Sequence, residues 1–110
     1  MATPKRIYLA GPEVFFPAEE HQAIVAEKKR LLLKYGLEGV DPLDTELAAS
    51  DSESKFRLGH RIYRANRELM DSCDAIIANL TPFRGISADP GTVFEVGYMI
   101  GQGKPAFGFT

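Results

Sequence analysis

Two carboxylates lie close together in the sequence, just before and just inside an apolar segment near the end of the chain. Asp89 stands before Pro90-Gly91, and Glu95 follows six residues after Asp89. Two carboxyl groups in different surroundings can divide the roles of proton donor and nucleophile, as in the cleavage of glycosidic bonds. A poorly hydrated carboxylate near the free N–H groups of a helix start is suited to nucleophilic attack. Glu95 is therefore the candidate nucleophile, and Asp89 its candidate partner.

Both carboxylates also have a structural alternative. The run Thr92-Val93-Phe94-Glu95 matches the Thr-x-x-Glu capping box, in which the glutamate only ties down a helix start. Asp89 equally fits an Asp-Pro-Gly turn. The helix expected over residues 93–102 is apolar nearly all round, which predicts that it is buried. A carboxylate buried there would need compensation, and this favours the chemical interpretation of Glu95.

Tyr8 is a candidate to hold that carboxylate. It lies in the apolar run Ile7-Tyr8-Leu9-Ala10, three residues before Gly11. Most strand tyrosines are packing residues, but this hydroxyl lies near the end of its strand, from which it can reach a ligand crevice.

The elements that must position these residues alternate between strand and helix. Strands are expected at residues 7–10, 37–41, 75–80 and 106–110, and helices at 18–35, 55–72 and 93–102. Gly36 and Gly103 are expected to end the first and third helices, and residues 43–54 to form a polar surface loop. Such alternation predicts an α/β fold with a parallel sheet and helices on both faces. Ligands then bind at the carboxyl ends of the strands, in loops 11–17, 41–54 and 80–92.

Composition limits the function classes. The chain has 110 residues, enough for one domain, and a net charge of −2, which implies no broad attraction to nucleic acid or membranes. It has one cysteine and no apolar run of membrane-spanning length, so a cytoplasmic location is expected. His21 and His60 have no partner at ligand spacing, and no metal site is predicted.

Five segments, in order along the chain, resemble the nucleoside 2-deoxyribosyltransferase family. They are Ile7-Tyr8-Leu9-Ala10-Gly11-Pro12, Asp41-Pro42-Leu43-Asp44, Asn66 with Asp74 to Leu80, Asp89-Pro90-Gly91-Thr92-Val93-Phe94-Glu95-Val96-Gly97-Tyr98, and Gly103-Lys104-Pro105. The fourth segment is the most specific of them. The resemblance implies a flavodoxin-like three-layer sandwich with strand order 2-1-3-4.

The resemblance also assigns roles. It makes Glu95 the nucleophile that attacks the anomeric carbon of a 2′-deoxynucleoside, Asp89 the acid that protonates the departing base, and Tyr8 the residue that positions the nucleophile. Substrate contacts are implied for Gly11, Pro12, Glu13, Phe16, Asp44, Asn66 and Met99. No cofactor is implied, because a glycosyl-enzyme ester stores the activated sugar. The implied partners are a nucleoside, a free nucleobase and further copies of the chain in a homo-oligomer. A single domain over residues 1–110 is expected, without the family's C-terminal strand and helix.

Two alternatives remain. Relatives that hydrolyse deoxynucleoside 5′-monophosphates tend to carry serine, arginine and glycine in the first loop. Here residues 12–17 include the acidic Glu13 and no arginine, which favours nucleosides over their phosphates. The second alternative is a non-catalytic nucleoside-binding module.

Overall fold

Four parallel strands form the centre of the molecule. The computed structural model describes residues 5–44 and 53–110. Its strands are β1 (Lys5–Ala10), β2 (Leu37–Val40), β3 (Ala75–Asn79) and β4 (Ala106–Phe109). They lie in the order β2-β1-β3-β4, and every neighbouring pair is parallel. The predicted α/β architecture and strand order are confirmed.

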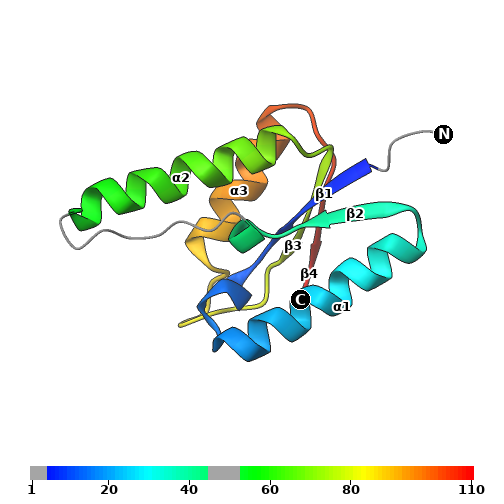
Figure 1. Cartoon of the computed structure of the whole chain (residues 1–110), viewed down its shortest axis with the longest axis horizontal. Helices are drawn as coiled ribbons and strands as arrows, with labels where there is room; N and C mark the ends of the chain where they lie inside the picture. Colours follow the sequence, from blue (N-terminus) through cyan, green and yellow to red (C-terminus); the bar gives the residue numbers. More distant parts are fainter. Residues whose placement is uncertain (1–4, 45–52) are drawn as a thin grey trace.

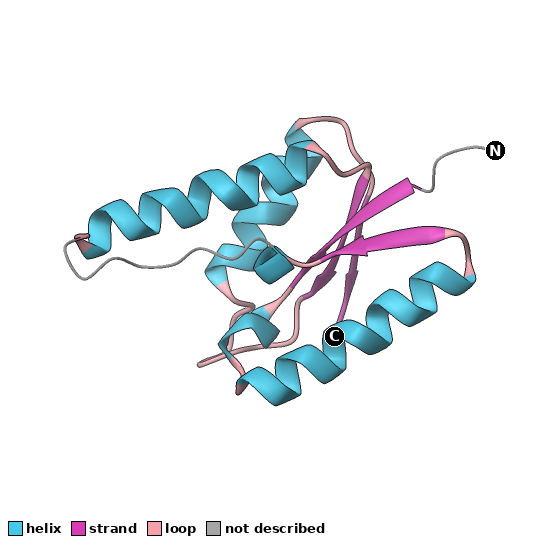
Figure 2. Ribbon diagram, viewed as in Figure 1, coloured by secondary structure: helices cyan, strands magenta, loops and turns pink. Residues whose placement is uncertain are grey.

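The helices cover both faces of this sheet. α1 (Ala18–Lys34) packs on one face, whereas α2 (Lys55–Asp71) and α3 (Pro90–Gly101) lie on the other (Figures 1 and 2). Alternate residues of β1 serve the two layers, as the pleat of a strand requires. Tyr8 and Ala10 join the core beneath α2 and α3, and Ile7 and Leu9 join the core beneath α1.

Glycines end two of the helices as predicted. Gly36 follows α1 with φ of +76°, and Gly103 follows α3 with φ of +75°. Both angles lie in the left-handed region, where a side chain is strained and glycine is not.

The start of α3 differs from the prediction. The helix begins at Pro90, three residues before the expected start, and its N-cap is Asp89 rather than Thr92. Asp89 Oδ2 accepts hydrogen bonds from the backbone N–H and the hydroxyl of Thr92, both at 3.0 Å. Proline is well suited to the first helical position because it has no N–H to leave unpaired. The capping-box interpretation of Thr92 and Glu95 is therefore wrong.

The expected burial of α3 on nearly all sides is also wrong. Val93, Phe94 and Ile100 are each more than half exposed, whereas Thr92 and Met99 are buried. A helix on a sheet can bury only the side that faces the strands, and no further layer covers the outer side of α3 within the described residues.

The loop expected at residues 43–54 is described only at its ends. Pro42–Asp44 forms a short 3₁₀ helix, η2, and residues 45–52 lie outside the described part of the chain. In the described segments, no helix is long and apolar enough to cross a membrane.

Candidate active site

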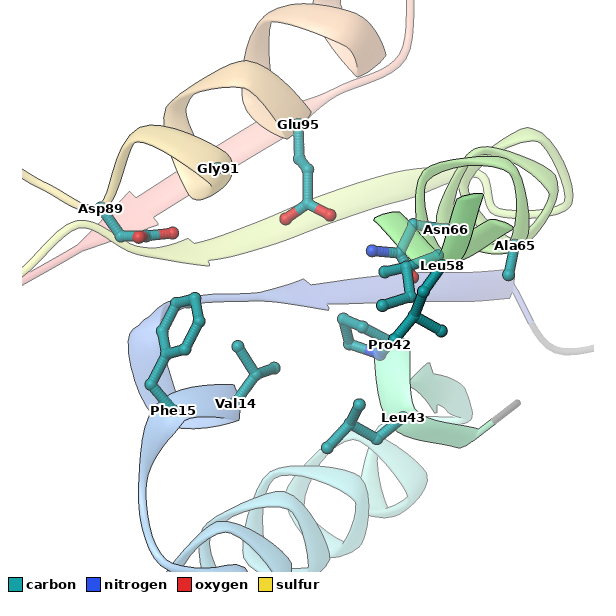
Figure 3. A pocket seen from close by; sticks show the side chains of 12 residues that line it. Val14, Phe15, Pro42, Leu43, Leu58, Ala65, Asn66, Asp89, Gly91 and Glu95 are labelled. Carbon is teal, nitrogen blue, oxygen red and sulfur yellow. The ribbon is translucent and has the colours of Figure 1, made fainter. Parts of the chain in front are cut away.

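A cavity of about 430 Å³ opens at the carboxyl ends of the strands. The chain leaves β1 toward α1 on one face and leaves β3 toward α3 on the other, and such a switch point is where open α/β sheets bind ligands. Figure 3 shows the carboxylates of Asp89 and Glu95 projecting from α3 into the space that Val14 and Phe15 face. The cavity is lined by Gly11, Val14, Phe15, Pro42, Leu43, Leu58, Ile62, Ala65, Asn66, Asp89, Gly91 and Glu95.

Tyr8 and Glu95 meet at the base of this cavity. The hydroxyl of the fully buried Tyr8 donates a hydrogen bond to Glu95 Oε2 at 2.6 Å. Burial strongly raises the pKa of Tyr8, and the adjacent Glu95 carboxylate raises it further, so the phenol keeps its proton and acts as a donor.

The surroundings of Glu95 act on its pKa in opposite directions. Burial raises the pKa of Glu95 to about 7, the Tyr8 hydrogen bond opposes this, and the negative charges of Asp89 and Asp41 add to it. Glu95 is the sixth residue of α3, beyond the first turn with its free N–H groups. The free N–H groups at the helix start, which were expected to stabilise Glu95, therefore stabilise Asp89. Glu95 receives its hydrogen bond from Tyr8.

Asp89 combines a structural contact with a position in the cavity. Its Oδ2 caps α3 through Thr92, as described above, and its side chain also lines the cavity beside Glu95. The proline that follows fixes where the helix begins, and this places the two carboxylates on one side of α3. The predicted pair is thus brought together in a single pocket.

The apolar face of α2 forms one wall of the cavity. Leu58, Ile62 and Ala65 recur at helical spacing, which predicts a core face, but in the structure they line the pocket together with Asn66. Val14, Phe15, Pro42, Leu43 and Gly91 also line it; they lie in the loops where ligands were expected, but they were not named as individual contacts. No sequence signal distinguishes these positions, because apolar residues pack equally well against a core or a ligand.

Glu13, expected to contact substrate, does not line the cavity. The buried carboxylate accepts hydrogen bonds from Lys28 Nζ at 2.8 Å and Asn79 Nδ2 at 2.7 Å. Burial alone would raise the pKa of Glu13, but these two donors outweigh it and hold the pKa below its usual value. A Cβ at Gly11 would collide with this carboxylate and come within 3.0 Å of the Asn79 Cβ, so glycine leaves the room that Glu13 occupies. The negative charge of the first loop is thus neutralised internally, and the argument that it repels phosphate loses its basis.

Of the other residues expected to contact substrate, Gly11 and Asn66 line the cavity and four do not. Met99 is fully buried in the core under α3, and Pro12 is buried at the start of η1 (Pro12–Phe15). Asp44 accepts two hydrogen bonds from Lys29 on the surface, and Phe16 packs at 6.3 Å from the ring of Phe83.

An arginine reaches the first loop from a distant segment. Phe15 stacks on Phe83 with ring centroids 5.6 Å apart. The guanidinium of Arg84 lies 5.0 Å and 4.7 Å from these two ring centroids, respectively. Arg84 also lines a second hollow of about 380 Å³ that shares Asp89 with the main cavity. A cation therefore stands beside the pocket although residues 12–17 contain none.

The described residues hold no group of three or more side chains suited to binding a metal ion. The cavity offers two carboxylates and apolar walls, and Tyr8 lies behind it as the donor to Glu95. An α/β protein with such a pocket at its switch point has the features of an enzyme that acts on a small molecule.

Comparison with known proteins agrees with this class. The family model described as nucleoside 2-deoxyribosyltransferase matches residues 7–110. A 2-deoxyribosyltransferase from Leishmania mexicana is 34% identical, with a TM-score of 0.80 over 96% of this chain and 64% of that chain. An uncharacterized protein of Schizosaccharomyces pombe is 39% identical over 105 residues, which make up 94% of this chain and 49% of the yeast protein. A CMP N-glycosidase from Clostridium botulinum, 20% identical with a TM-score of 0.58 over 94% of this chain and 70% of that chain, shares the fold.

The chain belongs to the nucleoside 2-deoxyribosyltransferase family. It spans about half the length of the yeast relative and somewhat less than two thirds of the Leishmania enzyme.

Proposed function

We propose that this protein cleaves the N-glycosidic bond of 2′-deoxynucleosides and transfers the deoxyribosyl group to another nucleobase. The observation that carries the proposal is the hydrogen bond from Tyr8 to Glu95 in a cavity that Asp89 shares. The family to which the chain belongs supports this reaction class.

In the first half-reaction the ionised Glu95 attacks the anomeric carbon C1′. The reactive form of the pair carries one proton, on Asp89 rather than on Glu95. The bond between C1′ and the base nitrogen breaks, a bond from Glu95 to C1′ forms, and Asp89 gives this proton to the departing base. Tyr8 binds Oε2, which leaves Oε1 as the attacking atom.

The second half-reaction reverses the first with a new base. Asp89, now ionised, takes a proton from the incoming base, whose nitrogen attacks C1′ and releases Glu95. Two displacements at C1′ retain its configuration. Gly11 and Asn66, which line the same cavity, are the proposed contacts to the nucleoside.

Base exchange tests the proposal directly. The protein is incubated with a deoxynucleoside and a different free base, and the exchanged nucleoside is measured by chromatography. Mass spectrometry of the protein with the donor nucleoside alone should show a deoxyribosyl adduct. Glu95→Ala should abolish both signals, whereas Glu38→Ala, at an exposed glutamate of β2, should leave both unchanged. Nucleoside binding with neither exchange nor adduct in the unaltered protein would instead indicate a non-catalytic binding module.

A second candidate function is hydrolysis of a 2′-deoxynucleoside 5′-monophosphate. It is favoured by the guanidinium of Arg84 beside Phe15, together with the internal neutralisation of Glu13 by Lys28. Initial rates of base release are compared for a nucleoside and its monophosphate, with Arg84→Ala and Arg30→Ala as matched variants. A faster monophosphate reaction that only Arg84→Ala slows would favour this alternative.

We also propose that the protein assembles as a homo-oligomer. Val93, Phe94 and Ile100 expose apolar surface on α3, and Phe107 and Phe109 do so on β4. Exposed apolar patches are typical of association sites, and β4 lies at an edge of the sheet. Light scattering after size exclusion measures the mass, and Phe94→Glu should shift it toward the monomer.

A further inference from the structure

An arginine stands at one end of the active-site cavity with its hydrogen-bond donors unused. Arg84 lies in the loop between β3 and α3, and its guanidinium is 5.0 Å from the ring centroid of Phe15 and 4.7 Å from that of Phe83. A guanidinium carries five N–H donors. Within residues 5–44 and 53–110, Arg84 has no hydrogen bond or ion pair with a protein acceptor. The two rings therefore hold the cation in place, and its donors face no protein partner.

The backbone at Arg84 has an unfavourable conformation. Its φ is +55°, the one positive value at a residue other than glycine in the described part of the chain. The left-handed region disfavours residues with a Cβ, and strain of this kind is concentrated at functional sites. The backbone N–H of Phe83 donates to the carbonyl oxygen of Ser87 at 3.0 Å and closes the loop around Arg84. The arginine is thus held in a defined turn.

Two hollows meet beside this arginine. Phe15 and Asp89 line the cavity of about 430 Å³. Phe83, Arg84 and Asp89 line the second hollow of about 380 Å³. The two hollows share Asp89, and the stacked rings of Phe15 and Phe83 also join them. Both volumes lie in the range of small-molecule sites, about 300 to 1,000 Å³, so the hollows can form two parts of one site.

The order of the side chains along the cavity indicates which part of a nucleoside reaches Arg84. Figure 3 places Asp89 and Phe15 toward one end of the cavity and Asn66 toward the other, with Glu95 between them. In the proposed reaction C1′ lies at Glu95, and the base lies at Asp89, which protonates it. The 5′ carbon is attached to C4′, on the other side of the ring oxygen from C1′. The base, rather than a 5′-phosphate, therefore extends past Asp89 into the second hollow.

The chemistry of a guanidinium discriminates between bases. It donates hydrogen bonds and accepts none. Hypoxanthine and uracil carry a carbonyl oxygen, which accepts, at the ring position where adenine and cytosine carry an amino group, which donates. A donor that faces another donor leaves both groups without a partner and is costly once water is excluded. Arg84 therefore suits a carbonyl oxygen at that ring position.

We propose that the second hollow is the subsite for the nucleobase, and that Arg84 selects bases with a carbonyl oxygen over those with an amino group at the same ring position. The inference rests on the proposed function for the orientation of the nucleoside, with C1′ at Glu95 and the base at Asp89. It names the preferred substrate class as nucleosides of such oxo bases.

Binding of free bases tests this selection without requiring turnover. Dissociation constants are measured by equilibrium dialysis for two matched pairs, hypoxanthine with adenine and uracil with cytosine. In the pair that binds more tightly, the unaltered protein should prefer the oxo base by about 10- to 100-fold, the effect of one hydrogen bond to a charged group. Arg84→Gln offers an acceptor as well as a donor, so it should bring the two affinities together. Glutamine also has a Cβ, so the backbone strain is the same in both proteins.

Arg30→Gln is the matched control. Arg30 is an exposed arginine that pairs with Glu27 on α1 and lines neither hollow. Its replacement should leave the ratio of the two affinities unchanged. If Arg84 only holds the rings of Phe15 and Phe83 together, Arg84→Gln lowers the melting temperature and weakens both bases equally, which overturns the proposal. Equal affinities in the unaltered protein, or no binding of any base, overturn it without a variant.

Initial rates of base exchange separate this inference from the proposed function. If both hold, oxo acceptors react faster than amino acceptors, and Arg84→Gln removes the difference. Selective binding without any exchange retains the inference and contradicts the proposed function. Exchange without selection does the reverse. If Arg84 holds a 5′-phosphate instead, Arg84→Gln slows base release from the monophosphate alone and leaves the ratio of oxo to amino bases unchanged, which overturns the inference.

Discussion

The hydroxyl oxygen of Tyr8 lies 2.6 Å from Oε2 of Glu95, although 87 residues separate the two in the sequence. The contact joins the central strand β1 to the helix α3 that follows β3. It is short, as expected when a phenol donates to a carboxylate. The carboxylate is thereby held in one orientation at the base of the cavity, and four predictions concern this site and its support.

Tyr8→Phe should slow the reaction without abolishing it. The lost hydrogen bond to a charged group should cost about 10- to 100-fold in kcat/KM. This bond lowers the pKa of Glu95, so its removal should raise that pKa and move the acid limb of the pH–rate profile to higher pH. The matched control is Tyr98→Phe, which removes a 2.7 Å hydrogen bond from α3 to the exposed Asp71 at the end of α2. If Tyr8→Phe and Tyr98→Phe lower kcat/KM equally, the hydrogen bond from Tyr8 to Glu95 has no specific effect on the reaction.

Variants of Asp89 should separate its effect as the N-cap of α3 from its proposed effect as a proton donor. Asparagine is as good an N-cap as aspartate, so Asp89→Asn should keep the stability of α3, whereas Asp89→Ala should lose about 1 kcal/mol. Both variants should lose activity on ordinary deoxynucleosides, because neither residue can protonate the base. Activity should return on a deoxyriboside whose leaving group is weakly basic, such as a nitrophenolate. Equal rates for the two kinds of substrate would remove the proton-donor role.

Glu95→Gln should stabilise the protein most at alkaline pH. The pKa of Glu95 rises from 4.5 to about 7 on folding. Between these values the folded protein binds more protons than the unfolded chain, so its free energy of unfolding falls as pH rises through this window. Because glutamine does not titrate, the variant avoids this loss. Its free energy of unfolding should exceed that of the unaltered protein by on the order of 1 to 3 kcal/mol at about pH 8.

Urea denaturation at about pH 5 and about pH 8 measures this advantage. Glu38→Gln on the surface of β2 is the control, and its difference from the unaltered protein should not change across the window. If Glu95→Gln raises the free energy of unfolding equally at both pH values, ionising Glu95 does not destabilise the folded protein. That result would contradict the prediction.

Two neighbouring lysines should differ in their contribution to stability. Lys28 pairs with the buried Glu13, whereas Lys29 pairs with the exposed Asp44. Lys28→Met leaves a buried carboxylate with one donor fewer and should cost about 1 to 3 kcal/mol. Lys29→Met breaks an exposed pair and should cost less than about 1 kcal/mol. Chemical denaturation of both variants checks the order, and a larger loss for Lys29→Met would contradict it.

Much of the fold follows from local patterns. Apolar runs ending at Gly11-Pro12 and at Pro42 mark strands whose carboxyl ends meet, and Gly36 and Gly103 end their helices where their left-handed angles allow. The boundary missed at α3 has a local cause. Asp89 and Thr92 are both good caps, and Pro90 decides between them because it favours the first helical position.

The cavity was less accessible to prediction. Leu58, Ile62 and Ala65 fit a core face by spacing, and nothing in that spacing reveals that the sheet leaves space beside them. The guanidinium of Arg84 contacts the ring of Phe15 although the two residues lie far apart in the sequence. Such contacts depend on how the elements pack together. Periodicity in the sequence describes only one element at a time, so it does not reveal them.

The sequence alone determined the alternation of parallel strands and helices, and it placed two carboxylates at one helix start, because both follow from residue types a few positions apart. Tertiary structure decided how they differ: Asp89 caps α3, while Glu95 lies beneath the cavity against Tyr8. It also raised the pKa of Glu95 to about 7. Burial and the charges of distant groups are properties of the packed chain, and only folding brings Tyr8 and Glu95 into contact.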